Sequence, residues 1–470
     1  MRVSLIAPPR LSGLREIKTN IPPTALLYLA STLRAHNHTP CIHDLSIVSG
    51  LTTDNRDELP QAVLQAIDRF TPDLFAINCF TTLHFRSISH ISKSLRKQYP
   101  DIPIVLGGAH PSLFPKDILK NCSYIDYIVV GEGEEQIVQL ANMLSLNGAN
   151  GDLSHIQSFA WRKEGEIIYQ PRRSFVGDLD SLADPAWDLI NITDYYTDHS
   201  DWNNPKNQTF HLGIPILSSR SCPFGCNFCA AYTIMGRKLR LRSPQRVVDE
   251  MQMLHEKHGQ NYFSFLDDNM NVNKPHILAI CADICKRNLN IQFETLSGLH
   301  MGSLDSQVID ALEQAGCVFV RLPIEHGNDR IRNEVIGKRL DREKIYEVCE
   351  AFKKTNIRIC GMYIMGFPED SCETLEDTRK MILELQVDIN IVFNLLPFPG
   401  TRVFEQALRD GLFLRNYDRD LLWTGETALD PTDTASQFIL KPYNMTMDEL
   451  VIYRGIFDKL RIFTNETVQE

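Results

Sequence analysis

Three cysteines lie close together near the middle of the chain, Cys222, Cys226 and Cys229. Three thiolates with this C-x3-C-x2-C spacing, on a loop that contains Gly225, can bind three corners of a 4Fe–4S cube. No fourth cysteine lies nearby, so the fourth iron stays open, and an open coordination position is where a metal centre can do chemistry. A zinc site is the alternative reading, but zinc needs four protein ligands and the nearest histidine is the distant His211.

The composition indicates a globular protein rather than a disordered or repetitive one. The chain has 470 residues, 43% hydrophobic and 23% charged, which suggests two or three domains. The formal net charge of -11 argues against a nucleic-acid partner. The apolar run after Met1 is too short for a signal peptide, and no run approaches the ~20 residues of a membrane span. We therefore expect a cytoplasmic protein whose 12 cysteines are reduced.

The elements that position these cysteines form two β/α series. In residues 1–146 the apolar runs predict strands and helices that alternate, as in a doubly wound, flavodoxin-like α/β domain. The predicted strands are Val3–Ala7, Pro40–Asp44, Asp73–Asn78, Ile104–Leu106 and Tyr127–Val130, and the predicted helices lie near 23–36, 60–70, 85–98, 112–120 and 133–145. Such sheets bind ligands at the carboxyl ends of their strands.

The remaining chain divides into a linker, a barrel and a cap. Residues 147–207 predict a linker with a β-hairpin that turns at Glu164-Gly165. Residues 208–402 predict a partial (β/α)6 barrel, two strands short of eight. Its six strands are expected at 215–218, 262–266, 291–296, 318–323, 358–364 and 388–393. Ser243-Pro244 and Gly259 predict the ends of one helix, and Gly316 the end of another. Residues 403–470 predict a mostly helical C-terminal cap, with helices at 401–412 and 446–464.

The cysteine motif resembles the signature of the radical S-adenosylmethionine (SAM) superfamily. Ser219-Arg220-Ser221 before the motif, and Gly236-Arg237-Lys238 after it, strengthen the resemblance. The resemblance implies that SAM chelates the open iron and is cleaved by one electron to a 5′-deoxyadenosyl radical. It also implies that Phe228 lies beside the adenine.

Segments after successive barrel strands resemble the same superfamily, which implies further SAM contacts. After the second strand, Asp267 and Asp268 would contact the SAM amino group, although Asp268 is equally suited to cap the next helix. Ser297, after the third strand, could reach the ribose or simply form a turn. Gly366 belongs to a Gly-Phe-Pro sequence after the fifth strand, and its backbone would lie beside the adenine.

The segment after the fourth strand supplies the candidate catalytic residues. Leu322-Pro323-Ile324-Glu325-His326-Gly327-Asn328-Asp329 resembles Gly-Ile-Glu-Ser-Gly-Asn-Asp of the superfamily, but departs from it at Pro323 and His326. Glu325 is a candidate for a hydrogen bond to SAM. His326 is a candidate acid or base towards the substrate, and a polar histidine satisfied within the protein is the alternative.

Loops in the first domain resemble those of the cobalamin-binding domain that precedes the barrel in one branch of the superfamily. The candidate cobalamin-binding residues are Thr81, Thr82, Gly107, Gly108, His110, Gly131, Glu132, Gly133 and Glu134. Glycines allow the backbone to approach a corrin and hydroxyls can bond the nucleotide base, but glycines also make tight turns. The Asp-x-His-x-x-Gly motif that supplies a histidine to cobalt elsewhere is absent. Some relatives have a first domain that binds no cobalamin.

The resemblance implies a cobalamin-dependent radical SAM methyltransferase of the class B type. Such an enzyme methylates an unactivated carbon or phosphorus of a small-molecule or peptide substrate and takes electrons from a flavodoxin or ferredoxin. The nearest alternative is an oxidative cyclase or rearrangement enzyme of the same architecture. A methylthiotransferase would use a second cluster on Cys41, Cys79 and Cys122, but Cys41 is expected within a strand. A non-catalytic iron–sulfur carrier would not need the SAM-contacting segments.

Overall fold

The computed structural model describes residues 1–9, 21–48, 51, 59–67, 70–148, 151–171, 175–195, 213–414, 423–425 and 434–461. These residues form two compact units. The first contains residues 1–196 with the segments 233–235 and 419–428, and the second contains the remainder, so far as each is described. The predicted boundary between linker and barrel, at 207 and 208, lies outside the described residues.

The first unit is built on a seven-stranded sheet in the order β2-β1-β3-β4-β5-β6-β7. Strands β1 to β5 pair in parallel, whereas β6 and β7 pair antiparallel. The strands are Arg2–Ala7 (β1), Thr39–Asp44 (β2), Leu74–Asn78 (β3), Ile104–Gly107 (β4), Tyr127–Val129 (β5), Phe159–Lys163 (β6) and Glu166–Gln170 (β7). The five predicted parallel strands are confirmed, and β1, β3 and β5 are almost wholly buried because helices cover both faces.

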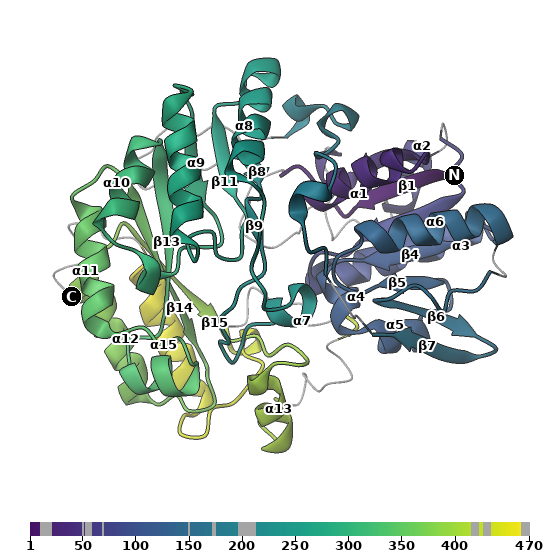
Figure 1. The fold of residues 1–470 in the computed structure, drawn as a ribbon. Helices are drawn as coiled ribbons and strands as arrows, with labels where there is room; N and C mark the ends of the chain where they lie inside the picture. The colour runs from purple at the N-terminus through teal and green to yellow at the C-terminus, as the bar shows by residue number, and fades with distance from the viewer. Residues whose placement is uncertain are drawn as a thin grey trace. The chain divides into compact units, whose positions relative to one another are not determined.

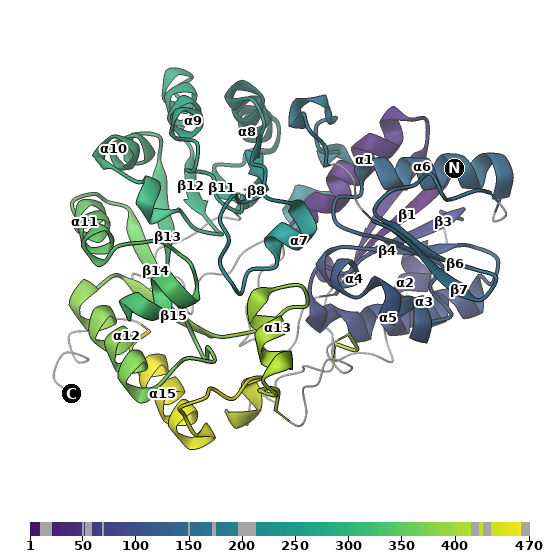
Figure 2. The same ribbon diagram turned by 60° about the horizontal axis from the view of Figure 1, so that its bottom comes forward.

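Helices lie on both faces of this sheet (Figure 2). Helix α1 packs with α6, and α2 packs with α3, which gives the two helical layers of a doubly wound fold. The helices are Thr24–Ala35 (α1), Leu59–Ile67 (α2), Phe85–Gln98 (α3), Ala109–Leu113 (α4), Pro115–Asn121 (α5) and Glu134–Asn147 (α6). The predicted α/β class is therefore confirmed for this unit.

The single helix predicted over 112–120 is wrong, because the structure has two helices there. Helices α4 and α5 are separated at Phe114. Pro115 takes the first position of α5, where its missing N–H leaves no helical hydrogen bond unmade. The break leaves His110 in a short helix of its own, directly after β4.

The predicted hairpin is confirmed, and it also extends the first sheet. Strand β6 pairs antiparallel with β5 as well as with β7, and the turn residues Glu164 and Gly165 have φ of +53° and +84°. Phe159 and Trp161 of β6 are buried in the core of this unit. The hairpin therefore covers the β5 edge of the parallel sheet, which the sequence pattern did not indicate.

The second unit contains six parallel strands in the order β15-β14-β13-β12-β11-β8, as predicted for a partial barrel. Helices α8 to α12 line its outer face (Figure 1). The strands are Ile214–Ile216 (β8), Tyr262–Phe265 (β11), Gln292–Thr295 (β12), Cys317–Glu325 (β13), Arg358–Met365 (β14) and Ile389–Asn394 (β15). The helices are Pro244–His258 (α8), Lys274–Lys286 (α9), Ser306–Gln314 (α10), Arg342–Lys353 (α11) and Cys372–Leu385 (α12).

Glycines end two barrel helices as the sequence predicts. Gly259 follows α8 in the left-handed conformation, and Gly316 follows α10 with φ of +91°. A Cβ on Gly316 would lie 2.4 Å from the Ile291 carbonyl oxygen, so this position also needs glycine for space. Ser243 occupies the predicted N-cap of α8, but its side chain makes no capping hydrogen bond.

The C-terminal region packs on the edge of the barrel sheet. Helix α13 (Arg402–Arg409) and helix α15 (Met447–Lys459) form as predicted, and α15 contacts α12 and β15. The last residues of the predicted helix, from 462 onward, lie outside the described residues. Among the described residues, no helix is both long and apolar enough to cross a membrane.

Candidate active site

The three cysteines lie on a loop that begins at the carboxyl end of the first barrel strand. After β8, strand β9 (Ser219–Arg220) pairs with β10 (Arg240–Leu241) and closes the base of the loop. Two backbone hydrogen bonds fix the middle of the loop at Asn227. Asn227 N donates to the Ile336 carbonyl oxygen at 2.9 Å, and Val403 N donates to the Asn227 carbonyl oxygen at 3.2 Å. The loop is therefore held by three distant parts of the chain.

The donor set of this loop fits an iron–sulfur cluster. Cys222, Cys226 and Cys229 are all free and half-buried. Burial raises the pKa of Cys226 to about 12 and that of Cys229 to about 11, and the thiols raise one another's pKa, so they are near neighbours. Among the described residues, no group of three His, Cys, Asp or Glu side chains converges on a single ion. Three free thiols close together on one loop suit three corners of a cube.

A stacked ring pair, missed by the sequence reasoning, supports the loop from the third strand. Phe224, between the first two cysteines, stacks on His300 with ring centroids 4.0 Å apart and an interplanar angle of 16°. The Asn271 side chain makes two hydrogen bonds with the His300 backbone: its Nδ2 donates to His300 O, and its Oδ1 accepts from His300 N. Ser303 bonds the His300 ring at 2.9 Å. No local sequence pattern indicates this pair, because the two residues are far apart in the chain.

The two aspartates after β11 have different environments. Asp267 is 2% exposed, and its carboxylate accepts bonds from Ser218 N at 3.0 Å, Ser218 Oγ at 2.7 Å and Ser219 Oγ at 2.5 Å. It therefore ties the end of β11 to the start of the cysteine loop. Asp268 is exposed, yet the surrounding protein desolvates it and raises its pKa. Of the two, Asp268 offers an accessible carboxylate to the SAM ammonium.

Other residues at this end of the barrel fit a polar ligand. Asn269 is buried, and its Oδ1 has no hydrogen-bond partner among the residues that the structure describes, while its Nδ2 lies 3.8 Å from the Cys222 sulfur. Ser297 is exposed, and its hydroxyl donates to the Leu266 carbonyl oxygen at 3.3 Å. A polar atom buried without a partner costs about 1–3 kcal/mol, which a bound ligand can recover.

Glu325 is paired with a lysine that the sequence reasoning missed. Lys338 Nζ lies 2.8 Å from Glu325 Oε1, and both side chains are 9% exposed. Burial lowers the pKa of Lys338, but the Glu325 carboxylate and the thiols of Cys226 and Cys222 raise it, and the net direction is upward. The ammonium is therefore charged and close to the cysteines. Glu325 also has a φ of +70°, a strained conformation of the kind found at functional sites.

The His326 side chain is fully buried and holds a loop. It is 0% exposed, and its Nε2 bonds Asp370 Oδ1 at 3.1 Å, so no ligand can reach it in this structure. The Asn328 N–H donates to its Nδ1 at 3.0 Å. Asp370 Oδ2 in turn accepts from Gly366 N at 2.8 Å and Phe367 N at 2.9 Å. We therefore propose a positioning role for His326 in place of the acid–base role.

The loop that His326 and Asp370 hold lies beside the aromatic residue of the motif. Phe228 contacts Phe367 edge to face, with ring centroids 6.1 Å apart. Gly366, at the end of β14, has a φ of +92°, which favours glycine. Phe228 and the Gly366 backbone thus lie on adjoining loops, as a shared contact with adenine requires.

Replacing Asp370 with asparagine tests this arrangement. An amide has one oxygen in place of two, so its NH2 group must face either the N–H groups of Gly366 and Phe367 or the N–H of His326 Nε2. One set of hydrogen bonds is lost in either orientation, and we expect a loss of about 2 kcal/mol in local stability. Amide hydrogen exchange of residues 366–370 measures it. Glu369→Gln is the control, because Glu369 bonds the Gln406 side chain rather than this backbone. Equal exchange in the two variants would contradict the prediction.

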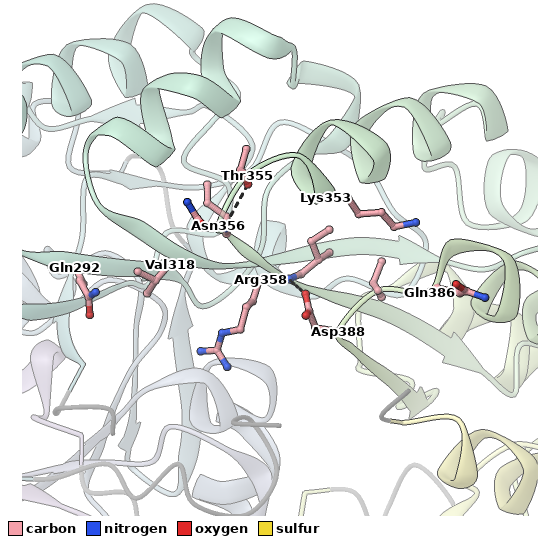
Figure 3. A pocket seen from close by; sticks show the side chains of 11 residues that line it. Gln292, Val318, Lys353, Thr355, Asn356, Arg358, Gln386 and Asp388 are labelled. Carbon is pink, nitrogen blue, oxygen red and sulfur yellow. Dashed lines mark hydrogen bonds between the residues drawn. The ribbon is translucent and has the colours of Figure 1, made fainter. Parts of the chain in front are cut away.

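A polar pocket of about 600 Å³ lies at the opposite end of the barrel strands. Lys353, Arg358, Gln386 and Asp388 line it, and all lie at or before the amino ends of β14 and β15 (Figure 3). The cysteine loop follows the carboxyl end of β8. Residues at the amino ends of barrel strands serve stability rather than chemistry, so we do not assign the reaction to this pocket.

In the first unit, the candidate residues lie at the carboxyl ends of neighbouring parallel strands. Thr81 and Thr82 follow β3, Gly108 and His110 follow β4, and Gly131 to Glu134 follow β5. These strands are adjacent in the sheet, so the three loops share one edge, which we call the β3–β5 edge. Parallel sheets bind ligands at such an edge.

The β3–β5 edge fits a large flat ligand. Phe80 is 65% exposed beside Thr81, an unusual position for a large apolar ring. A Cβ on Gly107 would make only an ordinary contact with the Val129 side chain, at 4.0 Å. Gly108 instead packs tightly, because its φ is +108° and a Cβ there would lie 2.6 Å from the Cys79 carbonyl oxygen. The exposed Phe80 ring beside the Thr81 hydroxyl suits contact with a corrin and its nucleotide.

The remaining candidates at this edge have structural partners. Glu132 accepts a hydrogen bond from Val176 N at 3.2 Å, which ties the segment after the hairpin to the edge. Gly131 N donates to Ser112 Oγ at 2.7 Å. Gly133 is the N-cap of α6, and Glu134 lies in its first turn, where a carboxylate is stabilised by the helix dipole.

His110 is buried and neutral, which predicts a pH dependence of stability. Burial lowers its pKa from 6.5 to about 3. Between these pH values the unfolded chain binds a proton at His110 that the folded chain does not. The contribution of His110 to the free energy of unfolding is therefore fully present above pH 6.5 and decreases as the pH is lowered below that value. We expect the His110 contribution at pH 5.0 to be about 2 kcal/mol lower than at pH 7.5.

Amide hydrogen exchange of β3 and β4 as a function of urea measures this in the first unit. His110→Phe is the matched variant, and the difference in pH slope isolates His110 from the other buried groups. Identical slopes in the two proteins would refute the assignment.

Comparisons with known proteins identify a domain family in each of the two units. The radical SAM superfamily profile matches residues 216–382, and the B12 binding domain profile matches residues 12–141. An uncharacterised methyltransferase of Pyrococcus horikoshii is 28% identical, over 93% of this chain and 89% of its own length. The anaerobic magnesium-protoporphyrin IX monomethyl ester cyclase of Rubrivivax gelatinosus is 26% identical, over 86% and 70%.

A solved structure shares the fold of both units. The radical SAM methyltransferase of Kitasatospora setae, solved with cobalamin and a 4Fe–4S cluster, aligns with a TM-score of 0.70 and 17% identity, over 96% of this chain and 80% of that one. At this identity the likeness establishes the fold. The two family models, found together in one chain, show that it belongs to the radical SAM superfamily, in the branch with a B12-binding domain.

Proposed function

We propose that the protein is a cobalamin-dependent radical SAM methyltransferase that methylates an unactivated carbon or phosphorus of a small-molecule or peptide substrate. The observation that carries this proposal is the presence, in one chain, of a three-cysteine loop at the carboxyl end of a partial barrel and a doubly wound unit with a B12-binding profile. The cluster with SAM supplies a 5′-deoxyadenosyl radical, and cobalamin supplies the methyl group.

The residues of the second unit bind and orient SAM in this proposal. Cys222, Cys226 and Cys229 hold the cluster. Asp268 binds the SAM ammonium through its accessible carboxylate. Phe228 and the Gly366 backbone flank the adenine, and the buried His326–Asp370 pair fixes the loop that carries Gly366.

The Glu325–Lys338 pair bonds SAM from the end of the fourth strand in this proposal. The pair is buried and its lysine is charged beside the cysteines. Its preformed geometry avoids reorganisation when SAM binds, which is how a positioned site lowers a barrier. Each cleavage consumes one electron, and we propose a flavodoxin or ferredoxin as the donor.

The first test uses protein reconstituted without oxygen with iron, sulfide and cobalamin, then given SAM and a low-potential reductant. We expect both 5′-deoxyadenosine and S-adenosylhomocysteine by mass spectrometry, with the second product requiring cobalamin. Deoxyadenosine without S-adenosylhomocysteine would contradict methyl transfer. It would favour the cyclase reaction named for the Rubrivivax gelatinosus relative.

A further inference from the structure

A short turn from the C-terminal region, Trp423–Gly425, belongs to the first compact unit. The chain before and after it, through Leu414 and from Thr434 onward, belongs to the second unit. The two sides meet at a closed base, because Leu414 N donates to Ile439 O at 3.1 Å and an antiparallel bridge lies next to this bond. The chain thus leaves the second unit, contributes a turn to the first, and returns.

The turn contacts residues at the β3–β5 edge. The Trp423 carbonyl oxygen lies 2.9 Å from His110 Nε2. The Trp423 ring meets the Phe85 ring edge to face, with centroids 6.3 Å apart. Gly425 is buried with a φ of +70°, and a Cβ on it would lie 2.6 Å from the Thr82 carbonyl oxygen. Three independent contacts therefore join the turn to the segments after β3 and β4.

His110 is the anchor of this contact. A carbonyl oxygen only accepts, so Nε2 carries the proton and donates to Trp423, and Nδ1 accepts from the Thr82 hydroxyl at 3.2 Å. The ring is 1% exposed and packs between Phe85 and Phe114, with centroid distances of 4.6 and 5.0 Å. Both nitrogens are used within the protein, so His110 has no lone pair to offer a ligand.

We propose that Trp423–Gly425 braces the β3–β5 edge in the shape that binds cobalamin, and that His110 is the positioning residue that anchors this brace rather than a residue that touches the cofactor. The cofactor named here rests on the proposed function, whereas the brace itself does not. The consequence is that a C-terminal segment, outside the residues matched by the B12-binding profile, sets the affinity of the first unit for cobalamin.

The first test compares two glycine variants in the full-length protein. Gly425→Ala introduces a clash with the Thr82 carbonyl oxygen, whereas Gly411→Ala has the same kind of φ, +65°, and no atom of the described residues lies within 4 Å of its Cβ. We expect amide hydrogen exchange of residues 82–86 and 109–114 to quicken about tenfold in Gly425→Ala, since losing a buried contact of this kind costs about 1.4 kcal/mol. Gly411→Ala is expected to match the wild type. Unchanged exchange in Gly425→Ala would overturn the brace.

The second test measures binding of hydroxocobalamin to the same proteins by equilibrium dialysis. Gly425→Ala is expected to bind about tenfold more weakly than the wild type and Gly411→Ala. Unchanged or tighter binding would overturn the proposal, because tighter binding would mean that the turn occupies the site. If wild type binds no hydroxocobalamin, the proposed function fails, and the exchange measurement still decides whether the brace exists.

Two His110 variants separate anchoring from simple packing. His110→Phe keeps a ring between Phe85 and Phe114 but cannot donate to Trp423, whereas His110→Gln keeps an N–H donor. We expect quicker exchange at 109–114 and weaker hydroxocobalamin binding in His110→Phe, with partial rescue of both in His110→Gln. Wild-type exchange and binding in His110→Phe, without rescue in His110→Gln, would contradict the anchoring role.

Discussion

Alanine at Cys226 is expected to reduce SAM cleavage to the level of a control without enzyme. The cluster needs three thiolates to leave one iron open, and two thiolates on this loop cannot hold a 4Fe–4S cube in that position. The loop itself should persist, because backbone bonds from Asn227 and Val403 fix it independently of the thiols. Quantification of 5′-deoxyadenosine after anaerobic reconstitution, together with the iron content, measures the effect.

Cys285→Ala is the matched control for this prediction. Cys285 is free and exposed on α9, away from the cysteine loop in sequence. We expect it to keep the iron content and the cleavage rate of the wild type. Cleavage at the wild-type rate in Cys226→Ala would remove the basis for placing the reaction at this loop.

Methionine at Lys338 is expected to destabilise the second unit by about 3–5 kcal/mol. The substitution keeps an unbranched chain but leaves the Glu325 carboxylate buried without its partner, and breaking a buried pair in this way costs about that much. Because Glu325 ends β13, the loss should be largest there. Amide exchange of β13 and β14, as a function of urea, reports on the second unit directly.

Two further variants serve as the control for this prediction and as the test that could contradict it. Lys344→Met breaks an ion pair whose Glu347 side chain is 63% exposed, so we expect less than about 1 kcal/mol. The double variant Lys338→Met with Glu325→Gln removes both charges and should recover most of the stability. A double variant as unstable as Lys338→Met alone would show that the buried charge is not the cause.

The sequence predicted the strands well because a buried strand requires a run of apolar residues, which is a local pattern. Five apolar runs in the first unit and six in the second became parallel strands within one or two residues of the predicted ends. The helix predicted over 112–120 failed because the apolar pattern continues across Phe114 while Pro115 starts a new helix. The hairpin at 159–169 was recognised, but its pairing with β5 depends on an open sheet edge that no local pattern reports.

The sequence was less informative about which polar residues a ligand can reach. Asp267 and Asp268 are neighbours with the same side chain, yet one is enclosed by Ser218 and Ser219 and the other is exposed. His326 stood in a segment similar to the superfamily, but its ring is buried against Asp370. Lys338 was not indicated, because its partner lies 13 positions away with no helical or strand period between them.

The sequence by itself determined the class of chemistry, because three cysteines spaced on one short loop define a donor set without help from the rest of the chain. It also determined the two β/α series, since alternating apolar runs are local. Only the tertiary structure decided that Lys338 pairs with Glu325, that His326 is buried against Asp370, and that Trp423–Gly425 joins the first unit. Those outcomes depend on contacts between distant segments, and such contacts form only when the chain is folded.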